Sequence, residues 1–204
     1  MVQKIGELLE IAADRALPVV RGIDDARLGD PTPCAEYDVR ALVNHLFLVV
    51  VNFQALAARE EVDFSQEPEF VTGGWRDRFG EETARLVEAW SVPGVEEGTT
   101  GAMGLPARTV GLMVLGDLTV HAWDLARATG GDFVPEPGVL DAVGPGLAAM
   151  APQAREMKMF GEPFPVGEDA TPFERLLSVT GRDPGWTPGR ATGGASGASG
   201  AGGS

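Results

Sequence analysis

The chain contains two histidines, and one of them, His121, lies between two acids. Asp117 precedes His121 by four residues, and Asp124 follows it by three. On an α-helix these spacings place all three side chains on one face, so both carboxylates can flank the imidazole. Imidazole nitrogen and carboxylate oxygen are ligands that zinc and similar divalent ions accept. The stretch 116–130 therefore predicts one half of a metal site, with either acid able to complete it.

The second histidine, His45, falls on the apolar stripe of its own segment and not on the polar face. A single histidine in that position is most often a core residue whose nitrogens are hydrogen-bonded. Both histidines of this chain, however, lie on inner faces, and His121 has an acid one turn before it. Two imidazoles and one carboxylate would leave open positions on Zn²⁺, which is the arrangement of a catalytic site.

Four long amphipathic stretches supply the helices that must position these groups. They are predicted over the first 18 or so residues, from Asp38 to about Ala58, from Trp75 to Trp90, and from Pro106 to Gly130. Asp38 is a good N-cap for the second stretch. Pro18 marks the final turn of the first or a kink in it. No segment with strand periodicity is present, so we predict an all-α four-helix bundle.

The remainder of the chain is less regular. Apolar spacing predicts a fifth helix around Val139 to Met150 and a short sixth helix from Pro172 to Val179, ended by Gly181. A Pro/Gly-rich arm, 160–169, separates them. We expect one domain over residues 1–186, followed by a disordered tail of Gly, Ala and Ser over 187–204.

Composition excludes several classes of function. A net charge of −14 and a pI near 4.5 argue against binding nucleic acid or an anionic membrane surface. The single cysteine, Cys34, excludes internal disulfides and cysteine metal clusters. The apolar run 42–51 is too short to span a bilayer, and no leader pattern is visible at the N-terminus. We therefore expect a cytoplasmic protein, and a homodimer is one expectation for its assembly.

Five motifs resemble the mycothiol-dependent maleylpyruvate isomerase N-terminal-like group of the DinB-like superfamily. They are Pro-Thr-Pro-Cys at 31–34, Asp-Val-Arg-Ala-Leu-Val-Asn-His-Leu at 38–46, His-Ala-Trp-Asp-Leu-Ala-Arg-Ala-Thr-Gly at 121–130, Asp-Ala-Thr-Pro-Phe-Glu-Arg-Leu-Leu at 169–177, and Gly-Arg-Asp-Pro-Gly-Trp at 181–186. The last two are similar to stand-alone, single-domain members. The resemblance extends over about residues 3 to 186.

This resemblance implies a DinB-like four-helix bundle that holds a divalent metal, usually zinc, between its second and fourth helices. The family's ligand positions correspond to His45, Asp117 and His121. Asp117 stands where the isomerase proper has the longer Glu. The isomerase also has a second, C-terminal domain that contributes to substrate handling, and this chain is too short to contain it, so the isomerase reaction itself is not carried over.

Other polar residues of the motifs allow two interpretations each. Asp124 is expected to bond a ring N–H or a loop amide rather than to ligate the metal. Arg127 is a candidate for binding the carboxylate of a peptide-like thiol cofactor, with a helix-end salt bridge as the plainer alternative. Cys34 precedes a helix start, where a thiolate is favoured, yet a lone intracellular cysteine is usually inert.

The functional prediction is a metal-dependent transferase or isomerase that adds mycothiol or a similar low-molecular-weight thiol to a small electrophile. A metal-bound thiol is deprotonated at neutral pH, which makes it a nucleophile. The sequence identifies neither the electrophile nor a catalytic residue. The alternative is a non-enzymatic DinB-like module that keeps a vestigial metal site and binds a small ligand or a protein.

Overall fold

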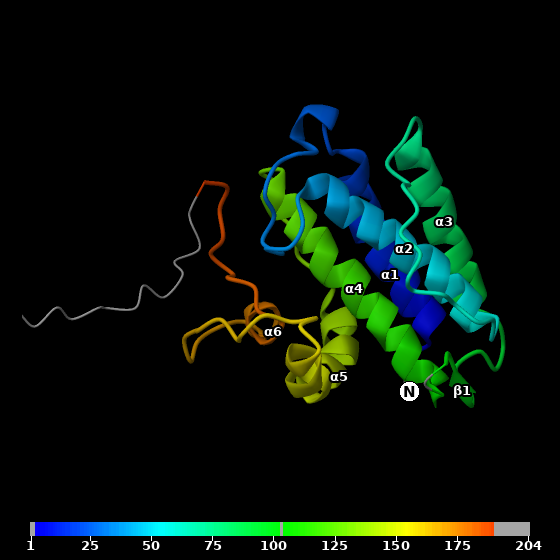
Figure 1. Ribbon diagram of the computed structural model, residues 1–204. Coiled ribbons are helices and arrows are strands. Elements are labelled where there is room, and N and C mark those ends of the chain that lie inside the picture. Colours follow the sequence, from blue (N-terminus) through cyan, green and yellow to red (C-terminus); the bar gives the residue numbers. More distant parts are fainter. Residues whose placement is uncertain (1–2, 103, 190–204) are drawn as a thin grey trace, which may run out of the picture.

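Figure 1 presents the computed structural model, which describes residues 3–102 and 104–189. Four long helices form a bundle: α1 (Ile5–Arg21), α2 (Val39–Ala57), α3 (Trp75–Trp90) and α4 (Ala107–Ala128). α1 and α2 each pack against both α3 and α4, so the four helices enclose one apolar core. The predicted all-α bundle is confirmed, and the four predicted helix ranges agree with these bounds to within a few residues.

The helix ends have recognisable chemical causes. The Asp38 carboxylate accepts a hydrogen bond of 2.8 Å from the backbone N–H of Ala41 and so caps α2. Pro18 lies in the final turn of α1. Gly130, at a φ of 79°, follows the last turn of α4, where a left-handed residue ends the helix.

Two further helices lie beside α4, on the side away from α3 (Figure 1). They are α5 (Pro137–Glu156), which packs on α4 and α1, and α6 (Pro172–Val179), which packs on α5. The backbone N–H of Glu174 bonds the Thr171 hydroxyl, and the Glu174 carboxylate reaches back to Thr171, so a capping box starts α6. Both predicted C-terminal helices are present, although α5 is longer than predicted.

Three short elements were not predicted. A 3₁₀ turn, η1 (Asp25–Arg27), lies between α1 and α2, and the strands β1 (Thr99–Thr100) and β2 (Leu105–Pro106) pair in antiparallel fashion before α4. Strands of two residues carry no hydrophobic alternation, so a search for strand periodicity cannot detect them. The predicted disordered tail, 187–204, falls almost wholly outside the described residues.

Within the described ranges, α2 is the single helix whose length and apolar composition would allow it to cross a membrane. Half of its most apolar window is buried inside the protein, between α3 and α4. The other half of the window is not buried, as in a helix that packs on the bundle with one face.

The crossing of α4 over α1, beside the end of α3, depends on a glycine. A Cβ added at Gly111 would lie 2.8 Å from Cγ2 of Ile5 and 2.9 Å from Cζ3 of Trp90, and both of these side chains are buried. We predict that Gly111→Ala lowers the free energy of unfolding by about 1–3 kcal/mol, because overpacking outweighs the gain in helix propensity. Chemical denaturation measures this difference.

The matched control is Gly146→Ala. Gly146 lies exposed inside α5, and a Cβ at this position would meet no atom within 4 Å. There the same substitution should stabilise the protein by about 0.5–1 kcal/mol. Equal effects at the two positions would show that the α4 crossing has room for a methyl group.

Candidate metal centre and cleft

The two histidines and Asp117 line the same cleft, which has a volume of about 330 Å³. α2 supplies His45, and α4 supplies Asp117 and His121. The segment before α2 adds Cys34 and Tyr37, and the turn after α6 adds Arg182. A second hollow of about 440 Å³ adjoins the first and shares Cys34 and Arg182 in its wall. The cleft therefore lies between the bundle and the C-terminal segment.

The imidazoles of His45 and His121 face each other across the cleft. Their ring centroids are 5.1 Å apart, and the ring planes are nearly perpendicular at 86°. The ring of Tyr37 stacks on the other face of His45, with centroids 5.2 Å apart. Nε2 of His121 lies 3.9 Å from Oδ1 of Asp117 on the same helix. The structure thus brings together the three residues that the sequence predicts as ligands.

Asp124 takes part in a different set of contacts. Its side chain has no solvent exposure, and its Oδ2 lies 3.0 Å from Nδ1 of His121. The same oxygen accepts a bond of 3.2 Å from Nη2 of Arg182. A carboxylate between these two donors assigns the hydrogen to Nδ1 of His121 and the lone pair to Nε2, the nitrogen on the Asp117 side.

The residues present fit a divalent metal. Ligands around a tetrahedral zinc with bonds of about 2.0–2.2 Å lie roughly 3.4 Å apart, close to the separation of His121 and Asp117. Nε2 of His121 carries the free lone pair, and its ring is held from behind by Asp124, as metal-ligating histidines usually are. His45 supplies a second imidazole opposite the first. This set of donors leaves coordination positions open toward the cleft.

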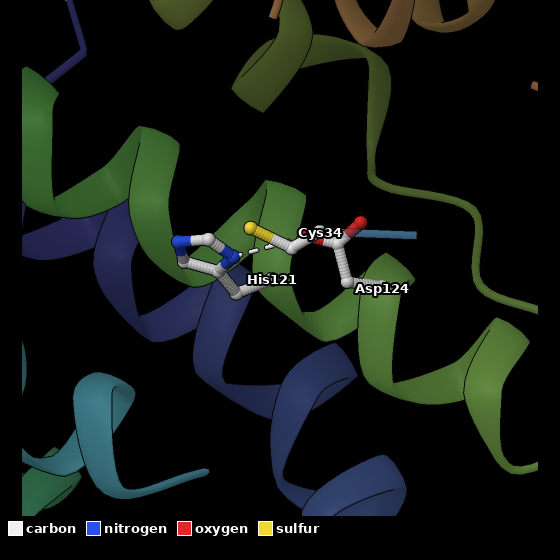
Figure 2. A group of neighbouring side chains, drawn as sticks. All are labelled: Cys34, His121 and Asp124. Carbon is white, nitrogen blue, oxygen red and sulfur yellow. Dashed lines mark hydrogen bonds and ion pairs between the residues drawn. The ribbon is translucent and has the colours of Figure 1, made fainter. Parts of the chain in front are cut away.

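A second group of donors lies next to the first. Atoms of Cys34, His121 and Asp124 fall within 4.8 Å of one another, and Figure 2 shows the Cys34 sulfur beside the other two side chains. Burial raises the pKa of the Cys34 thiol to about 11, so the sulfur is neutral at physiological pH. The cationic Arg182 already occupies the Asp124 carboxylate. Both features make this group a poorer cation site than His45, Asp117 and His121.

Burial also sets the charge of the other predicted ligands. It lowers the pKa of His45 to about 4, with a smaller contribution from the neighbouring His121, so His45 is a neutral donor at pH 7. Asp117 lines the cleft and keeps 37% of its side chain accessible. Burial by the surrounding protein nevertheless raises the pKa of the Asp117 carboxyl group, although His121 and Arg182 act to lower it. A neutral imidazole supplies a free lone pair, and an ionised Asp117 would supply the negative charge that a cation needs.

Arg127, the predicted cofactor-binding residue, does not line this cleft. Its guanidinium donates to the backbone carbonyl of Trp186 at 2.8 Å and to the Asp132 carboxylate at 3.0 Å. These contacts hold the end of α4 against the C-terminal segment. They correspond to the alternative role of Arg127, a salt bridge at the end of its helix. Sequence reasoning gave no role to Arg182, Tyr37 or Lys158, which all line the cleft. Arg182 lies in the motif at 181–186, but nothing in that motif indicates that Asp124 is its partner.

Comparison with known proteins identifies the family. Residues 9–126 match the mycothiol maleylpyruvate isomerase N-terminal domain, and this match covers more than half of the chain. The protein therefore belongs to that family. The match ends within α4, so α5, α6 and the segments around them lie outside it.

Two similar proteins, both described as uncharacterized, come from Mycobacterium tuberculosis strains CDC 1551 / Oshkosh and ATCC 25618 / H37Rv. Each is 29% identical over 179 residues, which covers 84% of this chain and 93% of the relative. Among solved structures, a histidine mutant of the mycothiol-dependent maleylpyruvate isomerase aligns with a TM-score of 0.51 and 17% identity, covering 78% of this chain and 72% of that chain. This structural likeness supports the fold.

The lowered pKa of His45 predicts how the stability of the metal-free protein changes with pH. Unfolded, His45 takes up a proton near pH 6.5, whereas folded it stays neutral down to about pH 4. The free energy of unfolding should therefore be largest above pH 6.5 and fall toward pH 4, by on the order of 3 kcal/mol from this group. Urea unfolding of the chelator-treated protein measures the slope.

His45→Gln should remove most of this pH-dependent loss while leaving the other titrating groups in place. Asp117, whose raised pKa acts in the opposite direction, is present in both proteins, so the difference between them isolates His45. An unchanged slope in His45→Gln would mean that His45 is solvated and titrates normally.

Proposed function

We propose that the protein is a metal-dependent transferase or isomerase that uses a low-molecular-weight thiol of the mycothiol type to attack a small electrophile. The observation that carries this proposal is the convergence of His45, Asp117 and His121 on one face of a cleft. Membership of the mycothiol maleylpyruvate isomerase family supports the choice of thiol and of reaction. Zn²⁺ is the proposed metal, because two imidazoles and a carboxylate suit it.

In this proposal, His45, Asp117 and His121 hold the ion, and a bound divalent ion lowers the pKa of a thiol in its open position. His45 and His121 contribute neutral nitrogens, and Asp117 contributes the single negative charge. The site therefore retains positive charge toward an incoming thiolate. Asp124 holds the ring of His121 in the tautomer that presents Nε2 to the cleft.

The cleft has space for both reactants. The inner hollow of about 330 Å³ holds the three predicted ligands, and the adjoining hollow of about 440 Å³ leads outward between Cys34, Lys158 and Arg182. We assign the inner hollow to the reacting sulfur and the electrophile, and the outer hollow to the polar body of the thiol. We further infer a soluble, cytoplasmic protein, since low-molecular-weight thiols are maintained in a reducing compartment.

The function is tested by turnover. Protein purified without a histidine tag is analysed for metals, loaded with zinc, and assayed for loss of free thiol with a panel of small electrophiles. We expect zinc-dependent turnover with mycothiol that chelation abolishes and zinc restores. Stoichiometric zinc without turnover of any thiol would instead favour the ligand-binding or protein-binding module.

The two acids flanking His121 should respond differently to mutation. Asp117→Ala removes a proposed metal ligand from a side chain that is partly exposed, so most of the zinc should be lost while the bundle stays folded. Asp124→Ala removes the acceptor of two buried donors, which should cost about 1–3 kcal/mol of stability. Zinc affinity should then fall by at most about 10- to 100-fold.

Zinc content by elemental analysis and melting temperature of both variants decide between the acids. Asp14→Ala, at an exposed position in the middle of α1, is a control that should leave the zinc content unchanged and the melting temperature nearly so. If Asp124→Ala is metal-free and Asp117→Ala retains its zinc, the assignment of the acids is reversed.

A further inference from the structure

We propose that Arg182 is a positioning residue for His121: by holding the Asp124 carboxylate, it keeps the ring oriented with Nδ1–H toward Asp124 and the Nε2 lone pair toward Asp117 and the cleft. Arg182 belongs to the C-terminal segment, outside the residues that match the family. The inference deepens the proposed metal centre and rests on it for its functional consequence. The test of this inference observes the tautomer of the His121 ring by NMR.

The geometry forms a continuous chain of buried polar contacts. Arg182 donates to Oδ2 of Asp124 at 3.2 Å, and the same oxygen lies 3.0 Å from Nδ1 of His121. All three side chains are buried: their exposed fractions are 7% for Arg182, 0% for Asp124 and 8% for His121. The Asp124 side chain has no solvent exposure, so its carboxylate depends on these two partners.

Charge explains why the arginine matters. An ionised carboxylate away from solvent is retained only when it is paired and hydrogen-bonded. Oδ1 of Asp124 has no hydrogen-bond partner within the described part of the chain, so Oδ2 makes both stabilising contacts. Without Arg182, His121 is the one remaining donor, and the carboxylate has no countercharge. The ring is then free to change tautomer or rotate, and either change removes the Nε2 lone pair from the cleft.

The backbone that carries Arg182 is held in place tightly. Gly181 has a φ of 82°, and a Cβ at this residue would lie 2.6 Å from the Cα of Gly161. The arm after α5 and the turn after α6 therefore cross in direct backbone contact, which only glycine allows. The N–H of Arg182 also bonds the carbonyl of Leu177 at 2.8 Å, and its Nη1 bonds the carbonyl of Thr180 at 2.8 Å. These contacts aim the guanidinium at Asp124.

The test is ¹⁵N NMR of the histidine rings in the metal-free protein. With two histidines in the chain, the His45→Gln background leaves His121 as the single imidazole to observe. In that background we expect His121 to show an Nδ1–H tautomer. Arg182→Met, which keeps an unbranched apolar stem but has no donor, should shift the ring to a mixture of tautomers, and Arg182→Lys should restore it in large part.

Arg155→Met is the matched control. Arg155 donates to the carbonyl of Val179 and lines the outer hollow, so its loss loosens the same segment without touching Asp124. We expect this variant to leave the His121 spectrum unchanged. A spectrum unaffected by Arg182→Met would overturn the proposal, as would an equal shift in Arg155→Met. If Arg182→Met does not fold by circular dichroism, Arg182→Leu, which also lacks both donor and charge, takes its place with the same outcomes.

A second measurement connects the ring to the metal. In the His45-containing protein, competition with a chelator gives the zinc dissociation constant of each variant. We expect Arg182→Met to weaken zinc binding by about 10- to 100-fold, the range seen when a group supporting a ligand is lost. Arg155→Met should stay within about twofold of the wild type. Zinc binding unchanged by Arg182→Met would contradict the proposed effect on the site, even if the tautomer shifts.

Discussion

The buried carboxylate of Asp124 is the constraint on which the site depends. It has no contact with solvent, and its Oδ2 serves both Nδ1 of His121 and the guanidinium of Arg182. A buried charge of this kind is tolerated only when its partners keep their places. The carboxylate therefore links two parts of the molecule, namely the fourth helix of the bundle and the turn after α6. The orientation of the inner imidazole follows from that link.

The position of α4 makes this arrangement feasible. This helix packs against α1, α2 and α5, and most of its side chains are buried. Glycines allow the close approaches: Gly111 lies against Ile5 and Trp90, and Gly116 lies against Leu147 of α5. The helix is thereby enclosed over much of its surface, and its polar side chains must find partners inside the protein. Near the middle of the helix, Asp117 keeps 37% of its side chain accessible, at the cleft.

How well each part of the site could be predicted from the sequence depends on how far apart in the chain the interacting residues lie. That His45, Asp117 and His121 lie close together could be predicted from sequence, because helical periodicity is local and two amphipathic helices of one bundle turn their apolar faces toward each other. Their proposed role as ligands came from the family resemblance. The contact of Arg182 with Asp124 spans 58 residues and depends on an arm without periodicity and on the crossing of Gly161 with Gly181. No local sequence pattern indicates that these two residues meet in the folded protein. For Cys34, the helix start suggested a thiolate, whereas burial determines a neutral thiol.

The residues that line the cleft come from two different parts of the chain. The floor, with both histidines, comes from the helices that match the family, and the facing wall, with Lys158 and Arg182, comes from the segment after α4. In the proposed function, reactivity and selectivity are thus encoded in separate stretches of one chain. Replacing the residues of the facing wall, apart from Arg182, would change which molecules are admitted while the bundle and its donors stay as they are. Such a division would allow one chemistry to be directed to different substrates through exchange of a single C-terminal portion.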